Sequence, residues 1–178
     1  YETGEATLWP GPNGAHNWQD MSYNPGTGLV YIPYMQLGMK FIRKPEVLGG
    51  LAMEPVMQDP EDGKGALVAY DPVSQSVRWK VQHPFMWNGG TLSTAGDLVF
   101  QGTADGFFSA YNAETGKRLW HYQIVHHDLW NYDVATQPLL TELTLHGKSV
   151  PAVVQNTKQG LVFVFHREFR RRARQVRG

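Results

Sequence analysis

Short apolar stretches separated by turn-forming residues recur along this chain of 178 residues. Apolar runs follow turns at residues 28–33 and 97–101, and two further runs, at 152–155 and 161–165, flank a polar loop. Runs of this length, bounded by Gly, Pro, Asn and Asp, are typical of β-strands joined by tight turns. The pattern predicts an all-β protein of antiparallel strands.

Residues 36–65 interrupt this pattern. The segment shows no clear period and contains several Gly and Pro residues. We predict a long insertion between two strands, and long loops of this kind often carry function.

The chain also contains an internal repeat. Residues 67–79 align with residues 108–120 at a period of 41, matching the pairs Ala69/Ala110, Tyr70/Tyr111 and Trp79/Trp120. A period near 40 that holds several short strands is typical of a four-stranded blade of a β-propeller. We therefore expect a partial β-propeller of about four antiparallel blades, with each Trp packed between neighbouring blades. Two unrelated hairpins are the alternative.

Composition and charge narrow the possible functions. The chain carries 16 Lys and Arg against 16 Asp and Glu, and it has no Cys. A balanced charge argues against nucleic-acid and membrane-surface binding, which need a basic excess. No apolar run reaches the roughly 18 residues of a membrane-spanning helix, and the segment shows no signal peptide. The lack of Cys excludes disulfides and thiol catalysis within it.

The basic residues are unevenly distributed. Residues 167–178 hold six Arg and one Glu, which leaves the rest of the chain acidic. A third copy of the repeat would begin near Phe163, but its turn glycine and closing Trp do not follow. The tail is a solvated basic terminus, a nucleic-acid arm or a product of out-of-frame translation, and we expect it to be disordered.

Several long motifs resemble the pyrroloquinoline-quinone (PQQ)-dependent dehydrogenases. Residues 14–18 (GAHNW), 21–33 (MSYNPGTGLVYIP) and 89–106 (GGTLSTAGDLVFQGTADG) resemble the alcohol dehydrogenases of that family. Residues 121–133 (HYQIVHHDLWNYD) and 157–165 (TKQGLVFVF) are closer to its glucose dehydrogenases. The resemblance implies part of an eight-bladed propeller with PQQ and calcium on its axis. It also implies a periplasmic oxidoreductase that passes electrons from an alcohol or sugar to a cytochrome or quinone.

The resembling segments follow one another in an unusual order. Residues 1–120 resemble the later part of the alcohol dehydrogenases, whereas residues 121–166 resemble a central part of the family. The junction falls in the repeat motif near residues 113–120, which both regions share. A chimera joined at the repeat and a circular permutation both explain this order. We divide the chain into these two propeller segments and the tail, 167–178.

The resemblance assigns cofactor contacts to three residues. Asn17 and Trp18 fall at PQQ-contacting positions, and an amide and an indole N–H both donate to quinone or carboxylate oxygens. Lys158 falls where the family places a cation on the quinone oxygens, and an ammonium there stabilises negative charge as the quinone is reduced. Without the resemblance, these residues read as a loop anchor and a solvated turn lysine.

Asn131 departs from the family pattern. The family has Asp at this position as calcium ligand and general base, and Asn can ligate calcium but cannot usefully accept a proton. If the chain is extended here, Asp133 points to the same face about 6–7 Å away and substitutes only after remodelling of the loop. On such a strand His126 and His127 point to opposite faces, so we interpret them as structural rather than metal-ligating.

Two functions remain open at this point. The first is a portion of a PQQ-dependent enzyme, inactive by itself, that oxidises a small alcohol or sugar. The second is a non-enzymatic propeller scaffold for protein binding. The motifs around Asn17, Asn131 and Lys158 favour the enzyme, because a scaffold needs only the repeat skeleton.

Overall fold

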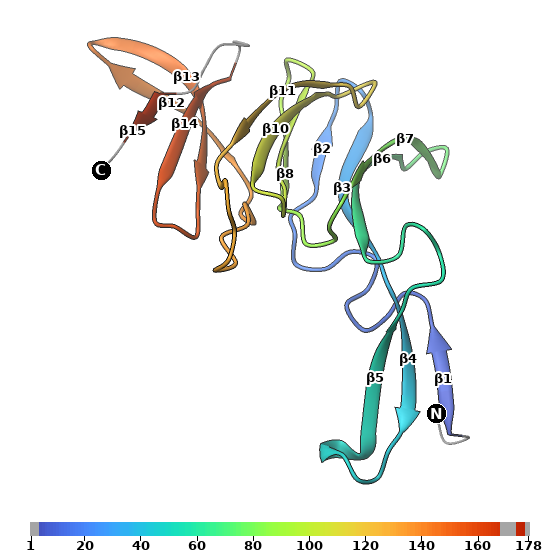
Figure 1. Cartoon of the computed structure of the whole chain (residues 1–178). Coiled ribbons are helices and arrows are strands. Elements are labelled where there is room, and N and C mark those ends of the chain that lie inside the picture. Colours follow the sequence, from blue (N-terminus) through green and yellow to red (C-terminus); the bar gives the residue numbers. More distant parts are fainter. Residues whose placement is uncertain (1–3, 168–173, 177–178) are drawn as a thin grey trace.

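The chain forms a row of antiparallel β-sheets, shown as successive groups of arrows in Figure 1. The computed structural model describes residues 4–167 and 174–176. In that part of the chain, three sheets have four strands each and one has three. The predicted all-β class and four-stranded antiparallel blades are confirmed. The expected number of about four blades is wrong, since the fourth sheet is not a blade.

The three four-stranded sheets are named the first, second and third blade in chain order. The first contains β2 (Ser22–Asn24), β3 (Leu29–Gln36), β6 (Lys64–Asp71) and β7 (Ser76–His83). The second contains β8 (Thr91–Ser93), β9 (Leu98–Gly102), β10 (Phe107–Asn112) and β11 (Arg118–Gln123). The third contains β12 (Leu139–Leu145), β13 (Lys148–Asn156), β14 (Val162–His166) and β15 (Arg174–Val176). In each blade the strands pair in chain order.

The sequence repeat is also a structural repeat. Ala69 on β6 pairs with Trp79 on β7, and Ala110 on β10 pairs with Trp120 on β11. Both ladders shift register directly after that alanine, so the two hairpins share a β-bulge at the same repeat position. An extra residue in one strand bends a hairpin and increases its twist, and it therefore aims both indoles alike.

Trp79 joins the first blade to the second. Its Nε1 donates to the carbonyl oxygen of Ala113 over 3.0 Å, and the Tyr31 hydroxyl donates to the same oxygen over 3.1 Å. Gly116 lies against the indole with a φ of 69°, and a Cβ there would come within 2.7 Å of Trp79 Cε3. A glycine is needed at this turn both for its backbone angle and for the room it leaves.

Trp120 occupies the corresponding place between the second and third blades. Its ring centroid lies 5.8 Å from that of Phe100 in its own blade and 5.5 Å from that of Phe165 in the next. Phe165 also lies 4.9 Å from Phe108. The predicted inter-blade positions of Trp79 and Trp120 are therefore confirmed, and apolar side chains fill both junctions.

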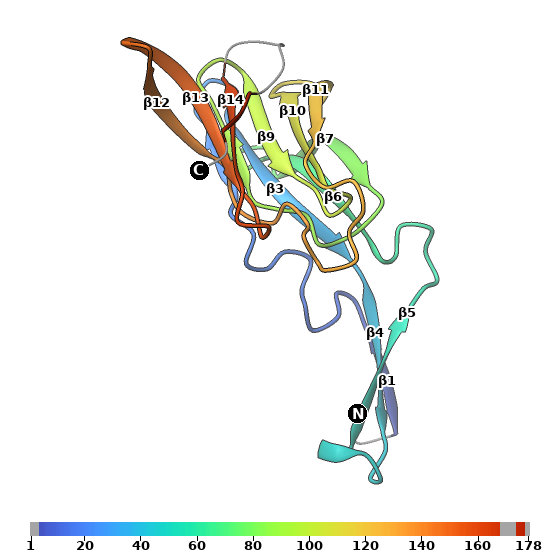
Figure 2. The ribbon, with the colours of Figure 1, turned by 60° about the vertical axis from the view of Figure 1, so that its left-hand side comes forward.

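A three-stranded arm projects from the first blade (Figures 1 and 2). The insertion between β3 and β6 supplies two of its strands, β4 (Gly38–Arg43) and β5 (Leu51–Val56), with the short 3-10 helix η1 (Leu48–Gly50) before β5. The third strand, β1 (Glu5–Leu8), comes from the segment before the first blade. The sequence placed an insertion here correctly but missed its strands.

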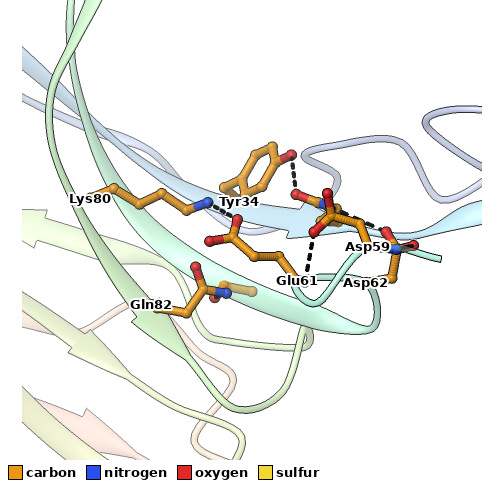
Figure 3. A network of polar contacts seen from close by, with 8 residues as sticks. Tyr34, Asp59, Glu61, Asp62, Lys80 and Gln82 are labelled. Atoms are coloured by element: carbon orange, nitrogen blue, oxygen red, sulfur yellow. Dashed lines mark hydrogen bonds and ion pairs between the residues drawn. The ribbon is translucent and has the colours of Figure 1, made fainter. Parts of the chain in front are cut away.

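A polar network joins the loop that follows the arm, residues 57–63, to the first blade (Figure 3). The buried Asp62 carboxylate accepts from the backbone amides of Gln58 and Asp59, each over 2.9 Å, and from Gln36 Nε2 over 3.3 Å. These hydrogen bonds, led by that of Asp59, hold the pKa of the Asp62 carboxyl below its ordinary value. Beside them, Lys80 forms an ion pair with Glu61.

The predicted segment boundary and the basic tail both fall in or beside strands of the structure. The boundary at residue 120 falls inside β11, and the order of the segments stays a prediction. Residues 168–173 and 177–178 of the tail lie outside the described residues, whereas residues 174–176 form β15 and pair with β14. In the described part of the chain, no helix has the length and apolarity to cross a membrane.

Candidate cofactor-binding site

The topology brings all four predicted site residues to one end of the blades. In a blade whose strands pair in chain order, the turn between its second and third strands lies at the same end as the connections to neighbouring blades. Asn17 and Trp18 lie in the segment leading into β2, and Asn131 lies in the connection between β11 and β12. Lys158 lies in the turn between β13 and β14. We call this end of the blades the connection end.

Asn131, Asp133 and Lys158 come together there. Lys158 Nζ forms an ion pair with Asp133 Oδ1. With its amide nitrogen turned toward Asp133, Asn131 donates to Asp133 Oδ1 over 2.9 Å, and its oxygen accepts from Lys158 Nζ over 3.3 Å. The three side chains thus form a closed polar cluster with one negative and one positive charge.

The condition of an extended backbone at residues 131–133 is not met. Asn131 has a φ of 61°, in the left-handed region that Asn tolerates better than most residues, and no strand covers this segment. This turn brings the Asn131 amide against the Asp133 carboxylate rather than about 6–7 Å away, the separation that two residues of strand would give. His126 and His127 also lie off any strand, both exposed in a bend.

Glycines of the second blade fix the backbone that carries Asp133. A Cβ at Gly89 or Gly102 would collide with the carbonyl oxygen of Val134. Gly90 N donates to the carbonyl oxygen of Ala135 over 3.3 Å. Because these glycines let the segment lie directly on the second blade, the Asp133 side chain is only 9% exposed.

The turn that carries Lys158 repeats a turn of the second blade. Gln155-Asn-Thr-Lys-Gln-Gly160 matches Gln101-Gly-Thr-Ala-Asp-Gly106. In both, the Thr amide and hydroxyl bond the carbonyl oxygen four residues on, and the Gly amide donates to the Thr carbonyl oxygen. Ala104 stands where the third blade has Lys158, so the turn itself does not need a lysine.

Asn17 and Trp18 lie apart from this cluster. Asn17 Nδ2 donates to the carbonyl oxygen of Asn13 over 3.0 Å, so its amide holds its own loop. The Trp18 side chain is 53% exposed. Within residues 4–167 and 174–176, no hydrogen bond or ion pair joins either residue to Asn131, Asp133 or Lys158.

The cluster suits an anionic, planar group better than a metal ion. An ammonium and an amide can donate to quinone or carboxylate oxygens, and the exposed indoles of Trp18 and Trp130 offer stacking surfaces at the same end. Calcium takes about 6–8 oxygen ligands. Here Asn131 and Asp133 offer their oxygens to Lys158, and the described residues contain no group of three acidic or His side chains arranged for a metal.

The sequence alone underestimates Asp133. There it is only a distant substitute for Asn131, whereas in the structure its carboxylate contacts both Asn131 and Lys158. Two signals were present in the sequence: an Asn able to turn the backbone at 131, and the repeated turn at residues 101–106 and 155–160. The glycine contacts behind Asp133 join distant segments and leave no local pattern.

Comparison with known proteins shows which proteins this chain is similar to. Residues 109–169 match the family described as glucose/ethanol/alcohol dehydrogenase, beta-propeller domain. Quinohemoprotein alcohol dehydrogenase ADH IIB of Pseudomonas putida is 47% identical over 131 residues, which are 69% of this chain and 19% of that protein. The dehydrogenase subunit of alcohol dehydrogenase (quinone) of Gluconacetobacter polyoxogenes is 39% identical over 133 residues, which are 64% of this chain and 18% of that protein.

A solved structure shows the same similarity in the fold. The crystal structure of quinohemoprotein alcohol dehydrogenase from Comamonas testosteroni superposes with a TM-score of 0.65 and 35% identity. The match covers 85% of this chain and 24% of that one. The chain therefore spans about a fifth of the length of the curated relatives it matches. By sequence and by fold, it is part of a β-propeller of the PQQ-dependent dehydrogenase family.

Proposed function

We propose that this chain forms part of the cofactor site of a quinoprotein that oxidises alcohols. The observation that carries the proposal is the cluster of Asn131, Asp133 and Lys158 at the connection end. All three residues lie within the segment that matches the dehydrogenase family model. The names of the relatives, which are alcohol dehydrogenases, support an alcohol as the substrate class.

Each residue has a role that follows from its chemistry. PQQ, when bound, supplies a quinone that accepts two electrons. The Lys158 side chain is 37% exposed, and its ammonium can reach an anionic oxygen at the connection end and stabilise its charge. The open Trp18 indole can donate through Nε1 or stack. Asn131 can donate to or accept from a ligand but cannot take a proton from a substrate hydroxyl.

The finer assignments belong to the same proposal. Calcium at Asn131 would need that amide to release Lys158 and would need oxygen ligands beyond this cluster. Sugar oxidation, a cytochrome or quinone acceptor and a periplasmic location follow from the family resemblance. Because the chain spans about a fifth of its relatives, we expect weak PQQ binding and no appreciable turnover by the chain alone.

A PQQ titration tests the proposal. PQQ is added to the purified chain, with and without calcium, and binding is followed by equilibrium dialysis. Dye reduction is then assayed with ethanol and with glucose. We expect saturable binding that Lys158→Ala weakens and that Lys117→Ala, which removes an exposed lysine of the second blade, leaves unchanged. Absence of binding, or equal loss in both variants, would contradict the proposal and favour a protein-binding scaffold.

A further inference from the structure

We infer that Asp133 is a positioning residue that holds the Lys158 ammonium in place at the connection end. The inference rests on the proposed function and adds to it a residue that touches Lys158 rather than the cofactor. Its basis is the ion pair between Lys158 Nζ and Asp133 Oδ1, completed by the Asn131 amide that bonds both partners.

Lys158 needs such a partner because its turn does not hold it. The matching turn of the second blade forms the same backbone hydrogen bonds with Ala104 at that position. A lysine side chain has four flexible carbons and carries about 2 kcal/mol of rotamer entropy. Without an anchor, the ammonium would sample many positions in solvent. Among the described contacts of Lys158, the charged one is that with Asp133.

Asp133 can serve as the anchor because its own position is fixed. Its side chain is 9% exposed, and the carbonyl of Val134 next to it lies against Gly89 and Gly102 of the second blade. Lys158, by contrast, comes from the third blade. The ion pair therefore sets the ammonium of one blade relative to the backbone of its neighbour.

Removing the Asp133 carboxylate should change PQQ affinity in opposite directions, depending on whether Asp133 positions Lys158 or acts only through its charge. Asp133 is an anion at a site proposed to bind an anionic cofactor. If charge alone decided affinity, removing the Asp133 carboxylate would tighten PQQ binding, since like charges repel. If Asp133 positions Lys158, its removal weakens binding, because the donor is no longer held where the ligand meets it.

The first experiment reads the lysine directly and needs no cofactor. The full chain is treated briefly with an acylating reagent, and the acylated fraction of each lysine is measured by mass spectrometry. We expect Lys158 to react more slowly than the exposed Lys117 in the unmodified chain. In Asp133→Ala, and in the isosteric Asp133→Asn that protects the fold, its rate should rise to that of Lys117. An unchanged Lys158 rate in both variants would overturn the inference.

The second experiment measures PQQ affinity in a mutant cycle. Asp133→Asn should bind PQQ about tenfold more weakly, a change of about 1.4 kcal/mol. In a Lys158→Ala background the same substitution should not weaken binding, because no ammonium remains to be positioned and only the repulsion between like charges is removed. Asp105→Ala is the matched control, since it removes a carboxylate from the corresponding turn of the second blade. Its affinity should stay the same or rise slightly.

The outcomes distinguish the two proposals. Tighter or unchanged binding by Asp133→Asn would refute positioning while leaving the proposed function intact. Equal weakening with and without Lys158 would also refute it, since Asp133 would then act independently. If the unmodified chain binds no PQQ, the proposed function fails, and the labelling experiment alone decides whether Asp133 holds Lys158.

Discussion

Substituting Gly116 by Ala tests how neighbouring blades are joined. Gly116 lies in the turn between β10 and β11 of the second blade, with a φ of 69°. A Cβ at this position would come within 2.7 Å of Cε3 and 2.8 Å of Cδ2 of Trp79 from the first blade. Real Cβ atoms do not approach ring carbons so closely, so the indole or the turn must move.

The expected cost has two parts. An L-residue in the left-handed region costs about 1–2 kcal/mol relative to glycine. Forcing an extra methyl group into a packed contact typically costs about 1–3 kcal/mol. Gly116→Ala should therefore destabilise the chain by about 2–5 kcal/mol. It should also strain the hydrogen bond from Trp79 Nε1 to the carbonyl oxygen of Ala113.

Gly147→Ala is a control that carries the backbone cost without the packing cost. Gly147 lies in the turn between β12 and β13 with a φ of 75°, close to that of Gly116, and a Cβ there would meet no heavy atom within 4 Å. It should cost only the backbone term of about 1–2 kcal/mol.

Urea unfolding of both variants, with the unmodified chain, measures the difference. We expect Gly116→Ala to unfold at clearly lower urea than Gly147→Ala. In a Trp79→Ala background the two substitutions should cost the same, because the indole is gone. Equal destabilisation in the presence of Trp79 would show that the inter-blade contact at Gly116 contributes nothing, and the blade-joining account would be wrong.

Three further predictions address other parts of the molecule. Burial lowers the pKa of His83, whose imidazole bonds Gln101 Oε1 over 3.0 Å, so the unfolded chain binds a proton below about pH 6.5 more readily than the folded one. Stability should therefore fall from pH 7 toward pH 5, and an equally steep fall in His83→Gln would contradict this. Asp62→Ala should loosen the arm and speed proteolysis within residues 37–63, as seen by mass spectrometry; unchanged cleavage would exclude Asp62 as its anchor. In a completed propeller, Asn131→Asp should raise turnover by roughly 10²–10⁴-fold, the usual share of a general base, and no gain would mean that residue 131 is not the base position.

The blade pattern was predictable because its signals are local. The 41-residue repeat aligns Ala69 with Ala110 and Trp79 with Trp120, and the structure pairs each alanine with its tryptophan. A large Trp side chain that recurs at the same position of each hairpin is expected to be buried between neighbouring blades. The arm was not predictable in the same way. A strand with one buried face alternates apolar and polar residues, and an exposed sheet does not need this alternation. In β4 and β5, accordingly, Lys and Glu lie beside apolar residues without a clear period.

The candidate site was predicted only in part. The family motifs placed Asn17, Trp18, Asn131 and Lys158 in connections, and the topology gathers them at one end of the blades. The contact between Asn131 and Asp133 depends on a single left-handed residue, which sequence alone does not fix. The burial of Asp133 depends on glycines more than 30 residues earlier in the chain, such as Gly89 and Gly102.

The measurement that tests the central claim most directly is a two-dimensional NMR titration of the isotope-labelled chain with PQQ. The claim is that the connection end, with the Asn131–Asp133–Lys158 cluster, receives the cofactor. We predict that the side-chain amide of Asn131, the backbone amide of Lys158 and the indole N–H of Trp18 shift on addition of PQQ. The backbone amide of Phe41 on the arm should stay in place. Shifts confined to the arm, or no shift at the cluster under saturating PQQ, would contradict the claim.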